Sequence, residues 1–204
     1  MRGKLITFEG SEGSGKSTQI AFVHRYLQRE KRPVVVIREP GGVKISEKIR
    51  SILLDPTNQG MSPECETLLY MAARAQLVYE TIEPALKKGK IVLCDRFLDS
   101  TVVYQGYGCG VDLDLIQTLG RFATRRIKPD LTFLFDIEVK KGLSRIKRKK
   151  DRIEKRSLAY HNRVRQGYRA LARQEPRRIV LIQGHKNREE IRDIVQRHIE
   201  RLIK

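Results

Sequence analysis

The sequence predicts an α/β fold with a five-stranded parallel sheet and helices on both of its faces. Three observations lead to this prediction. Short β-rich runs alternate with longer helical patterns along the 204 residues, which is typical of βαβ units. Each β-rich run is almost continuously apolar, as expected for strands that helices cover on both sides. A glycine-rich loop joins the first run to the first helical pattern, at the edge of the sheet where such folds bind ligands.

The strands and helices follow one another without a repeat or a linker. The expected strands cover residues 4–9, 33–38, 90–95, 130–136 and 178–183, and the expected helices lie near 17–31, 44–54, 64–88, 112–125, 139–149 and 155–174. A final helix has the clearest period, with Ile191, Ile194, Val195, His198, Ile199 and Leu202 on one stripe. We expect His198 to pack on this stripe rather than to bind a ligand. One domain over residues 1–204 is the simplest account.

Composition and cysteine content indicate a globular cytoplasmic protein. Hydrophobic residues make up 40% of the chain and charged residues 32%, which argues against disorder. We expect no secretory signal, and no membrane association because the longest apolar runs are far too short to cross a bilayer. Cys65, Cys94 and Cys109 cannot all pair and show no metal-ligand spacing, so we expect reduced thiols.

Positive charge is concentrated in the last two fifths of the chain. The formal net charge is +18, and residues 121–204 hold 26 Lys and Arg against 10 Asp and Glu. The run RIKRKKDRIEKR, at residues 145–156, carries much of the excess. Three interpretations are open: a solvated helix face, a segment that closes over nucleotide phosphates, or a strip that follows a nucleic-acid backbone.

The loop after the first strand matches the P-loop pattern G-x-x-x-x-G-K-[ST] in full. It reads Gly10, Ser11, Glu12, Gly13, Ser14, Gly15, Lys16 and Ser17, with Thr18 next. Glycines allow successive backbone N–H groups to surround phosphates, and the helix N-terminus adds partial positive charge. Lys16 is expected to reach the outer phosphates of a nucleotide, and Ser17 to bind Mg²⁺. The alternative is a glycine-rich turn that only caps a helix.

The dipeptide Asp95-Arg96 ends the strand expected at residues 90–95. Beside a P-loop, such a pair supplies a carboxylate that orients Mg²⁺ and a guanidinium that holds a phosphate. The alternative is a structural ion pair at the end of a buried strand. We therefore expect Asp95 at the metal and Arg96 at the acceptor phosphate.

Six blocks of sequence occur in a particular order. They are FEGSEGSGKST at residues 8–18, REPGG at 38–42, LLYMAARAQ at 68–76, CDRFLDSTVVYQGYG at 94–108, PDLTFLFD at 129–136 and DRIE at 151–154. A P-loop alone is shared by many functions, whereas REPGG, the arginine in LLYMAARAQ and the YQG together are much more specific. With these blocks the chain resembles the thymidylate kinases along nearly its whole length.

The resemblance implies a fold, a reaction and a set of ligands. The fold is like that of the P-loop nucleoside monophosphate kinases, with a helical lid at about residues 145–156. The reaction transfers the γ-phosphoryl group of ATP to dTMP, giving ADP and dTDP for dTTP synthesis, with Mg²⁺ as cofactor. The family is usually a symmetric dimer. We therefore expect a homodimer that binds ATP and dTMP and has no specific nucleic-acid partner.

The resemblance also implies which residues bind the acceptor phosphate. Arg50, Arg74 and Arg96 match family contacts to the phosphate and base, and a planar guanidinium suits both. The other residues expected at this site are Arg38, Pro40 and Ser100. The metal site would comprise Ser17, Glu39 and Asp95, and the Glu39-Pro40 peptide bond is a candidate for the cis form.

Five residues match positions that read the acceptor's base and sugar. Tyr70 stands where a ring stacks on thymine. Thr101 and Gln105 match positions that read the base edge, and Tyr104 matches one that disfavours a ribose 2′-hydroxyl. Glu12 matches an acidic residue near the sugar hydroxyl. For Tyr70 the alternative is a core position, because four residues along a helix bring it onto one face with the arginine of LLYMAARAQ.

Positive charge for the moving phosphoryl group has to come largely from outside the P-loop, because Lys16 is the only cation in that loop. The family has a subclass with arginines in its lid, and this chain resembles it. The expected catalytic residues are Lys16, Arg96, Arg148 and Arg152, the last two sharing a face if the helix continues. The competing cations are Lys147, Lys149 and Lys150, which offer a point charge and no planar fork.

Two other functions remain open from the sequence. One is another nucleoside or nucleotide kinase on the same fold, although three acceptor-site arginines favour a monophosphate acceptor. The other is a nucleotide-switched nucleic-acid-binding protein. The basic run at residues 145–156 lacks the interleaved aromatic residues that would stack on bases.

Overall fold

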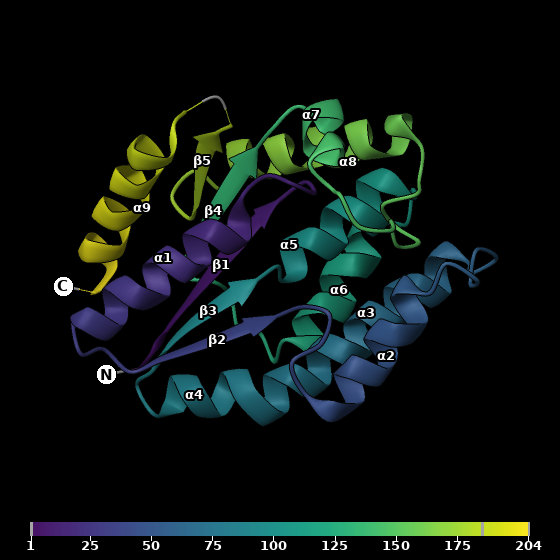
Figure 1. Cartoon of the computed structure of the whole chain (residues 1–204). Coiled ribbons are helices and arrows are strands. Elements are labelled where there is room, and N and C mark those ends of the chain that lie inside the picture. Colours follow the sequence, from purple (N-terminus) through teal and green to yellow (C-terminus); the bar gives the residue numbers. More distant parts are fainter. Residues whose placement is uncertain (1, 185, 204) are drawn as a thin grey trace.

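The computed structural model describes residues 2–184 and 186–203, with a parallel sheet between layers of helices (Figure 1). The strand order is β2-β3-β1-β4-β5, and every neighbouring pair is parallel. The strands are β1 (Lys4–Gly10), β2 (Val34–Arg38), β3 (Ile91–Asp95), β4 (Leu131–Asp136) and β5 (Ile179–Gln183). The predicted strands are confirmed to within one residue at each end.

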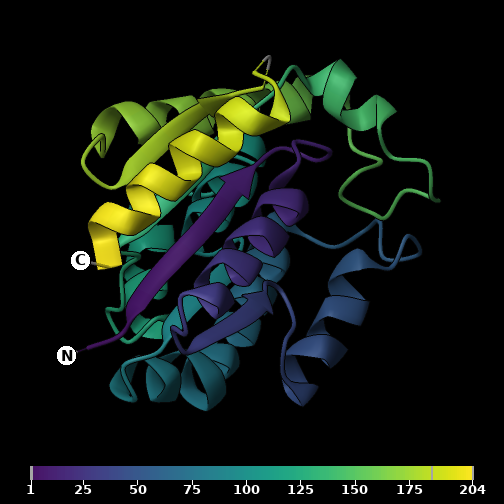
Figure 2. The ribbon, with the colours of Figure 1, turned by 60° about the vertical axis from the view of Figure 1, so that its left-hand side comes forward.

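Both faces of the sheet are apolar and covered. On one face, Ile6, Phe8 and Leu93 pack with residues of α1 (Lys16–Arg29) and α9 (Arg188–Ile203), which lie side by side in Figures 1 and 2. The alternate strand residues form a core on the other face with the helices there. These helices include α3 (Pro63–Leu77), α4 (Glu83–Lys87) and α8 (Leu158–Gln174). Burial on both faces explains why the strands are continuously apolar.

The helix predicted over residues 64–88 is interrupted. After α3 comes a π-helical turn, η1 (Val78–Ile82), and then α4. Pro84 has no N–H to continue the α-helical hydrogen bonds, which accounts for the wider turn just before it. Two other predicted helices are confirmed, as α2 (Lys44–Leu54) and α6 (Leu113–Ala123).

The segment after β3 contains helical structure that was not predicted. It consists of α5 (Leu98–Thr101) and a second π-helical turn, η2 (Val102–Gly108). Glycine lowers helix propensity, and η2 contains two glycines. Tertiary packing overrides that preference, because a Cβ on Gly108 would lie 2.5 Å from the ring of Tyr160 in α8.

The prediction of a helical lid is wrong for residues 145–156. The helix expected to reach residue 149 ends at Ser144, as α7 (Val139–Ser144), and α8 begins only after its N-cap, Ser157. Between them the chain forms turns and irregular structure, drawn in Figure 2 as an arm that extends from the sheet. The side chain of Asp151 accepts hydrogen bonds from the backbone N–H groups of Ile153 and Glu154, which favours a turn over a helix there.

Several smaller expectations can be compared with the described residues. None of their helices is both long and apolar enough to cross a membrane. Cys65, Cys94 and Cys109 are all free thiols. His198 packs its ring edge-on against Phe133 and contacts the carbonyl oxygen of Ile194 through Nδ1, so the prediction that it packs is confirmed.

Candidate active site

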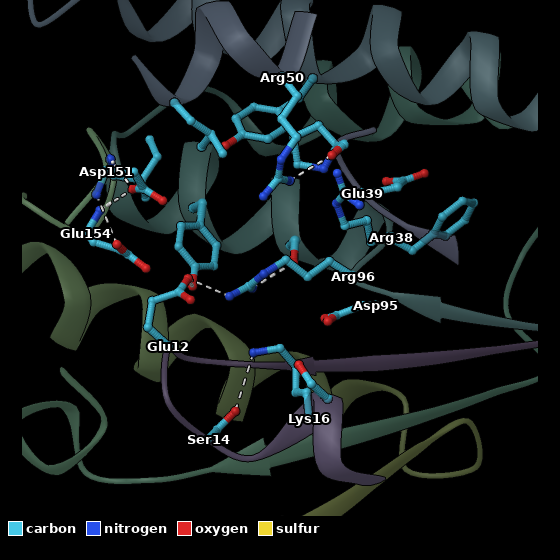
Figure 3. A pocket seen from close by; sticks show the side chains of 18 of the residues that line it. Glu12, Ser14, Lys16, Arg38, Glu39, Arg50, Asp95, Arg96, Asp151 and Glu154 are labelled. Carbon is cyan, nitrogen blue, oxygen red and sulfur yellow. Dashed lines mark hydrogen bonds and ion pairs between the residues drawn. The ribbon is translucent and has the colours of Figure 1, made fainter. Parts of the chain in front are cut away.

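A cavity of about 520 Å³ lies where β1, β2 and β3 end, at the edge where parallel α/β sheets bind ligands. It contains nearly every residue that the sequence placed in a site; Gly10, Ser11 and Arg152 are the exceptions. Figure 3 shows that Arg38, Arg50, Arg96 and Lys16 approach the same space from different elements. The predicted residues that line it are Glu12, Gly13, Ser14, Gly15, Lys16, Ser17, Thr18, Arg38, Glu39, Pro40, Arg50, Tyr70, Arg74, Asp95, Arg96, Ser100, Thr101, Tyr104, Gln105 and Arg148.

The P-loop runs from the end of β1 into α1 and turns back over Lys16. The Nζ atom of Lys16 donates to the carbonyl oxygens of Gly10 (3.0 Å) and Ser11 (3.1 Å). Burial, with a further contribution from the Arg96 guanidinium, lowers the pKa of Lys16 to about 8. An anion bound beside Lys16 would raise this pKa again, because a nearby negative charge favours the charged form of the amine.

The P-loop is in direct backbone contact with α7. Gly13 has φ +67°, and a Cβ added there would lie 2.2 Å from the carbonyl oxygen of Gly142. A Cβ on Gly142 would lie 2.4 Å from the carbonyl oxygen of Glu12. Only glycine allows this approach at both positions, so α7 lies directly against the phosphate-binding loop.

Arg96 follows β3 with φ 70°, a left-handed conformation that is unusual for a residue other than glycine. Its Nη2 atom lies 2.6 Å from Oε1 of Glu12. Its Nη1 atom donates to the hydroxyls of Ser100 (3.2 Å) and Tyr168 (3.1 Å), and its guanidinium lies over the ring of Tyr104. Strained conformations held by many contacts are typical of functional sites.

Glu9 is a fully buried carboxylate beneath Arg96 in the same network. It accepts hydrogen bonds from the backbone N–H of Phe97 (2.7 Å) and the hydroxyls of Ser100 (2.6 Å) and Tyr168 (2.7 Å). Burial, together with the negative charge of Asp99, raises the pKa of Glu9 to about 7. This carboxyl group therefore titrates near neutral pH.

Arg74 and Glu39 form a buried ion pair in the wall of the cavity. Nε of Arg74 lies 2.8 Å from Oε2 of Glu39, and both side chains are almost fully buried. Nη2 of Arg74 also donates to the carbonyl oxygen of Phe97 and the hydroxyl of Thr101. Burial raises the pKa of Glu39, although the charge of Arg74 opposes this. The peptide bond between Glu39 and Pro40 is cis.

Other contacts hold the rest of the wall that carries Arg50, Arg74 and Arg96. Arg50 donates to the carbonyl oxygen of Pro40 (2.8 Å), and Arg38 makes an exposed pair with Glu47. The hydroxyl of Tyr104 donates to Glu12 (3.1 Å). Half-buried Tyr70 lines the cavity, as a side chain able to stack on a base would.

The structure separates the two lid arginines that the sequence placed on one helix face. Arg148 lines the cavity, is exposed, and is held by both carboxylate oxygens of Glu154 (2.9 and 2.7 Å). Arg152 is buried, with Nη2 2.5 Å from Glu66 and Nε donating to the carbonyl oxygen of Leu53. They diverge because the chain turns at Asp151 instead of continuing as a helix.

A third lid arginine reaches the P-loop. Nη1 of Arg145 donates to the carbonyl oxygen of Gly13 at 2.9 Å. This contact was not predicted, since Arg145 was only one member of a basic run. Lys147, Lys149 and Lys150 are exposed and do not line the cavity.

The cavity holds donors that suit a magnesium ion bound mainly by substrate. The Oε1 atom of Glu39 is buried without a hydrogen-bond partner, and Ser17 and Asp95 line the same cavity. Across residues 2–184 and 186–203, no three His, Cys, Asp or Glu side chains are grouped as a metal site. Mg²⁺ usually takes one or two carboxylates and completes its shell with water and phosphate oxygens, so these donors fit it.

The chain is similar to known proteins of one family. The family model described as thymidylate kinase matches residues 8–195. The chain belongs to the thymidylate kinase family. Thymidylate kinase of Halothermothrix orenii is 47% identical over 196 residues, covering 94% of this chain and 93% of that protein. Thymidylate kinase of Carboxydothermus hydrogenoformans is 50% identical over 193 residues, covering 94% of each.

A solved structure of the family has the same fold. The crystal structure of thymidylate kinase from Ehrlichia chaffeensis matches with a TM-score of 0.75 and 35% sequence identity, covering 89% of this chain and 93% of that one. The predicted fold class, a five-stranded parallel sheet of the nucleoside-monophosphate-kinase kind, is therefore confirmed.

Five residues of this cavity were not predicted from the sequence. The cavity is also lined by Leu54, Phe97, Asp151, Ile153 and Glu154. Three of these belong to the DRIE block, so a signal existed in the sequence. Phe97 likewise belongs to the block at residues 94–108. Leu54 lies in none of the six blocks, and an apolar residue that lines a cavity has the same pattern as one in the core.

The pKa of Glu9 leads to a testable prediction about stability. The pKa of Glu9 is about 7 in the folded protein and 4.5 for the free side chain. Between pH 4.5 and pH 7, the folded protein therefore keeps a proton on Glu9 that the unfolded chain has lost. The free energy of unfolding should therefore fall as the pH rises from 4.5 to 7, by about 3 kcal/mol from this group. Glu9→Gln should lack this fall, because its amide imitates the protonated acid.

Urea unfolding of both proteins at pH 4.5, 6 and 8 measures the difference. We expect the free energies of unfolding of the two proteins to agree best at pH 4.5. As the pH rises, that of the parent should fall relative to that of the variant. A difference that does not change with pH would contradict the assignment of this proton to Glu9.

Proposed function

We propose that this chain catalyses transfer of the γ-phosphoryl group from ATP to dTMP, giving ADP and dTDP. One observation carries the proposal: a single cavity joins a complete P-loop to a wall that presents Arg50, Arg74 and Arg96. A wall with three guanidiniums suits an acceptor that already bears a phosphate. The curated relatives are named thymidylate kinases, which points to the same acceptor.

The residues divide between the two substrates. The P-loop N–H groups and Lys16 would hold the phosphates of ATP. Arg96 would hold the acceptor phosphate in line with the donor, since its contacts to Glu12 and Tyr168 fix its guanidinium. Tyr70 would stack on thymine. Arg74 would reach the base from beneath, oriented by its pair with Glu39.

Glu39, Asp95 and Ser17 are proposed to hold Mg²⁺, directly or through water. When bound, the ion would neutralise negative charge on the phosphates of ATP. The unpartnered Oε1 atom of Glu39 supports its place in this set.

We also propose that this chain belongs to the subclass whose lid arginines stabilise the moving phosphoryl group. Arg148 is the principal candidate, because it lines the cavity and its partner Glu154 orients it. Arg145 is a second candidate through its contact with the P-loop. Arg152 was also expected to be catalytic; in our proposal it acts indirectly, since its charge is neutralised by Glu66.

The basic lid segment supports an enzyme more than a nucleic-acid-binding protein. Its four arginines, Arg145, Arg148, Arg152 and Arg156, all contact other groups of this chain. These arginines therefore serve contacts within the protein, and they do not form a free row of cations that could follow a nucleic-acid backbone. Cytoplasmic location is proposed from the three free thiols, and residues 1–204 are proposed to act as one domain.

The acceptor assignment is tested with a panel of substrates. In a coupled assay for ADP with ATP and Mg²⁺, we expect dTMP to be turned over faster than dUMP and far faster than CMP, AMP or thymidine. Thymidine should fail because it has no phosphate for Arg96 to hold. Comparable turnover of thymidine and dTMP would exclude a monophosphate kinase.

The lid arginine is tested by Arg148→Ala, with Lys149→Ala as the matched control. An arginine that binds the moving phosphoryl group is worth on the order of a thousandfold in kcat. We therefore expect a loss of this order for Arg148→Ala, little change in dTMP binding, and a change within about threefold for the exposed lysine. Near-parental kcat for Arg148→Ala, alone and combined with Arg145→Ala, would rule out the lid mechanism.

A homodimer is proposed from apolar side chains on neighbouring helices. Helices α2, α3 and α6 pack in sequence, and each exposes apolar side chains: Ile52, Leu68, Leu115 and Phe122, the last 84% exposed. Exposed apolar groups on adjacent helices are typical of an interface between protein chains.

Light scattering after size-exclusion chromatography tests the dimer. We expect twice the chain mass of 23.6 kDa for the parent, and the single mass for Phe122→Asp at micromolar concentration. Leu181→Asp, on an exposed position of β5, is the control and should leave the dimer intact. A parent protein that elutes with the mass of one chain would contradict the proposal.

A further inference from the structure

Glu66, in α3, is a fully buried carboxylate contacted from two sides. Its Oε1 atom accepts a hydrogen bond from Nε2 of Gln105 at 2.8 Å. Its Oε2 atom lies 2.5 Å from Nη2 of Arg152 and 2.7 Å from Nη2 of Arg156. Burying a carboxylate is costly unless it is paired and hydrogen-bonded, and both oxygens meet that condition here.

These contacts join the lid segment to the acceptor wall. Gln105 lines the cavity, whereas Arg152 and Arg156 belong to the lid segment. Arg152 is further fixed to the C-terminal end of α2, because Nε donates to the carbonyl oxygen of Leu53 and its backbone N–H to that of Leu54. The C-terminal half of the lid segment is therefore anchored by buried contacts.

This anchored C-terminal half of the lid segment contains side chains that line the cavity. Arg152 points away to Glu66, and its neighbours Ile153 and Glu154 line the cavity. Glu154 is itself buried and holds the exposed guanidinium of Arg148 through two contacts. A chain of contacts thus runs from Glu66 through the turn to Arg148.

The N-terminal half of the lid segment is held much less firmly. Residues 147–150 are all exposed, and Arg145 touches the P-loop at a carbonyl oxygen that is itself near the surface. Firm placement of the lid therefore depends on the buried carboxylate at its other end.

We propose that Glu66 is a positioning residue that fixes the lid segment on the acceptor wall and so places Arg148 over the phosphates. The inference rests on the proposed function of the cavity, and Glu66 itself touches no substrate. Because Gln105 shares the same carboxylate, Glu66 also ties the acceptor site to the lid. Binding of dTMP and docking of the lid then favour one another.

Limited trypsin digestion measures lid docking without any turnover. The exposed lid residues include Lys147, Arg148, Lys149 and Lys150, which are trypsin sites. Glu66→Gln should raise the rate of cleavage there by about tenfold or more, since neutral glutamine leaves the buried guanidinium of Arg152 and the half-buried one of Arg156 without a counter-charge, and the segment opens locally. Excess dTMP should slow cleavage of the parent and have less effect on the variant.

Two further variants keep the test decisive if Glu66→Gln folds poorly. Of the two arginines that contact Glu66, Arg156 is the more exposed. Arg156→Gln removes it while Arg152 still pairs with Glu66, so this variant is expected to fold. It should raise lid cleavage about threefold or more. The control is Glu83→Gln, a carboxylate that also holds two cations, Lys87 and Arg125, neither of which belongs to the lid segment or lines the cavity. It should leave lid cleavage unchanged.

Kinetics separate positioning from a merely structural role. We expect Glu66→Gln and Arg156→Gln to lower kcat and raise KM for dTMP by about tenfold or less, with KM for ATP little changed. Their effects on kcat should be strongly non-additive in the double variant, because both break one contact. Arg156→Lys should restore part of the loss.

Unchanged lid cleavage in folded Glu66→Gln or Arg156→Gln would overturn the inference, as would additive effects on kcat. The proposed function fails separately, if the parent protein does not phosphorylate dTMP. The digestion result would still report whether Glu66 anchors the lid.

Discussion

The guanidinium of Arg96 contacts Glu12 of the P-loop, Ser100 of α5 and Tyr168 of α8 at the same time. The hydroxyls of Ser100 and Tyr168 both continue to Glu9 at the end of β1. The donor loop, the acceptor wall and α8 therefore share one hydrogen-bonded network, and the left-handed backbone of Arg96 is held in place by it.

The site brings many charged side chains close together. Lys16 and Arg96 repel one another, which contributes to the lowered pKa of Lys16. The negative charge of Glu12 stabilises both of these cations. Glu39 stabilises Arg74 in the same way. Glu66 of α3 and Glu154 of the lid segment hold the three lid arginines Arg148, Arg152 and Arg156. Carboxylates thus keep a strongly cationic site folded, while cations still face the cavity for anionic substrates.

Sequence patterns predicted the parts of this molecule that depend on local rules. Strand positions follow from apolar runs covered on both faces, and the P-loop follows from its glycines and Lys16, so both could be predicted. The path of residues 145–156 could not, because α7 ends at Ser144, where the sequence pattern predicted a continuing helix, and the side chain of Asp151 then turns the backbone. Arg152 was consequently expected in the cavity and lies buried on Glu66. Tyr168 was also missed, since its partner Glu9 is 159 residues away in the chain.

The close approach of Gly13 and Gly142 has a mechanical consequence. Most contacts between elements are made by side chains, which absorb small displacements by changing rotamer. Here peptide groups meet peptide groups with no side chain between them, and close-packed backbone transmits strain instead of absorbing it. Helix α7 leads directly into the lid segment, so a tilt of that helix would displace the backbone of the P-loop. The two glycines therefore couple the position of the lid segment to that of the P-loop without a side chain between them.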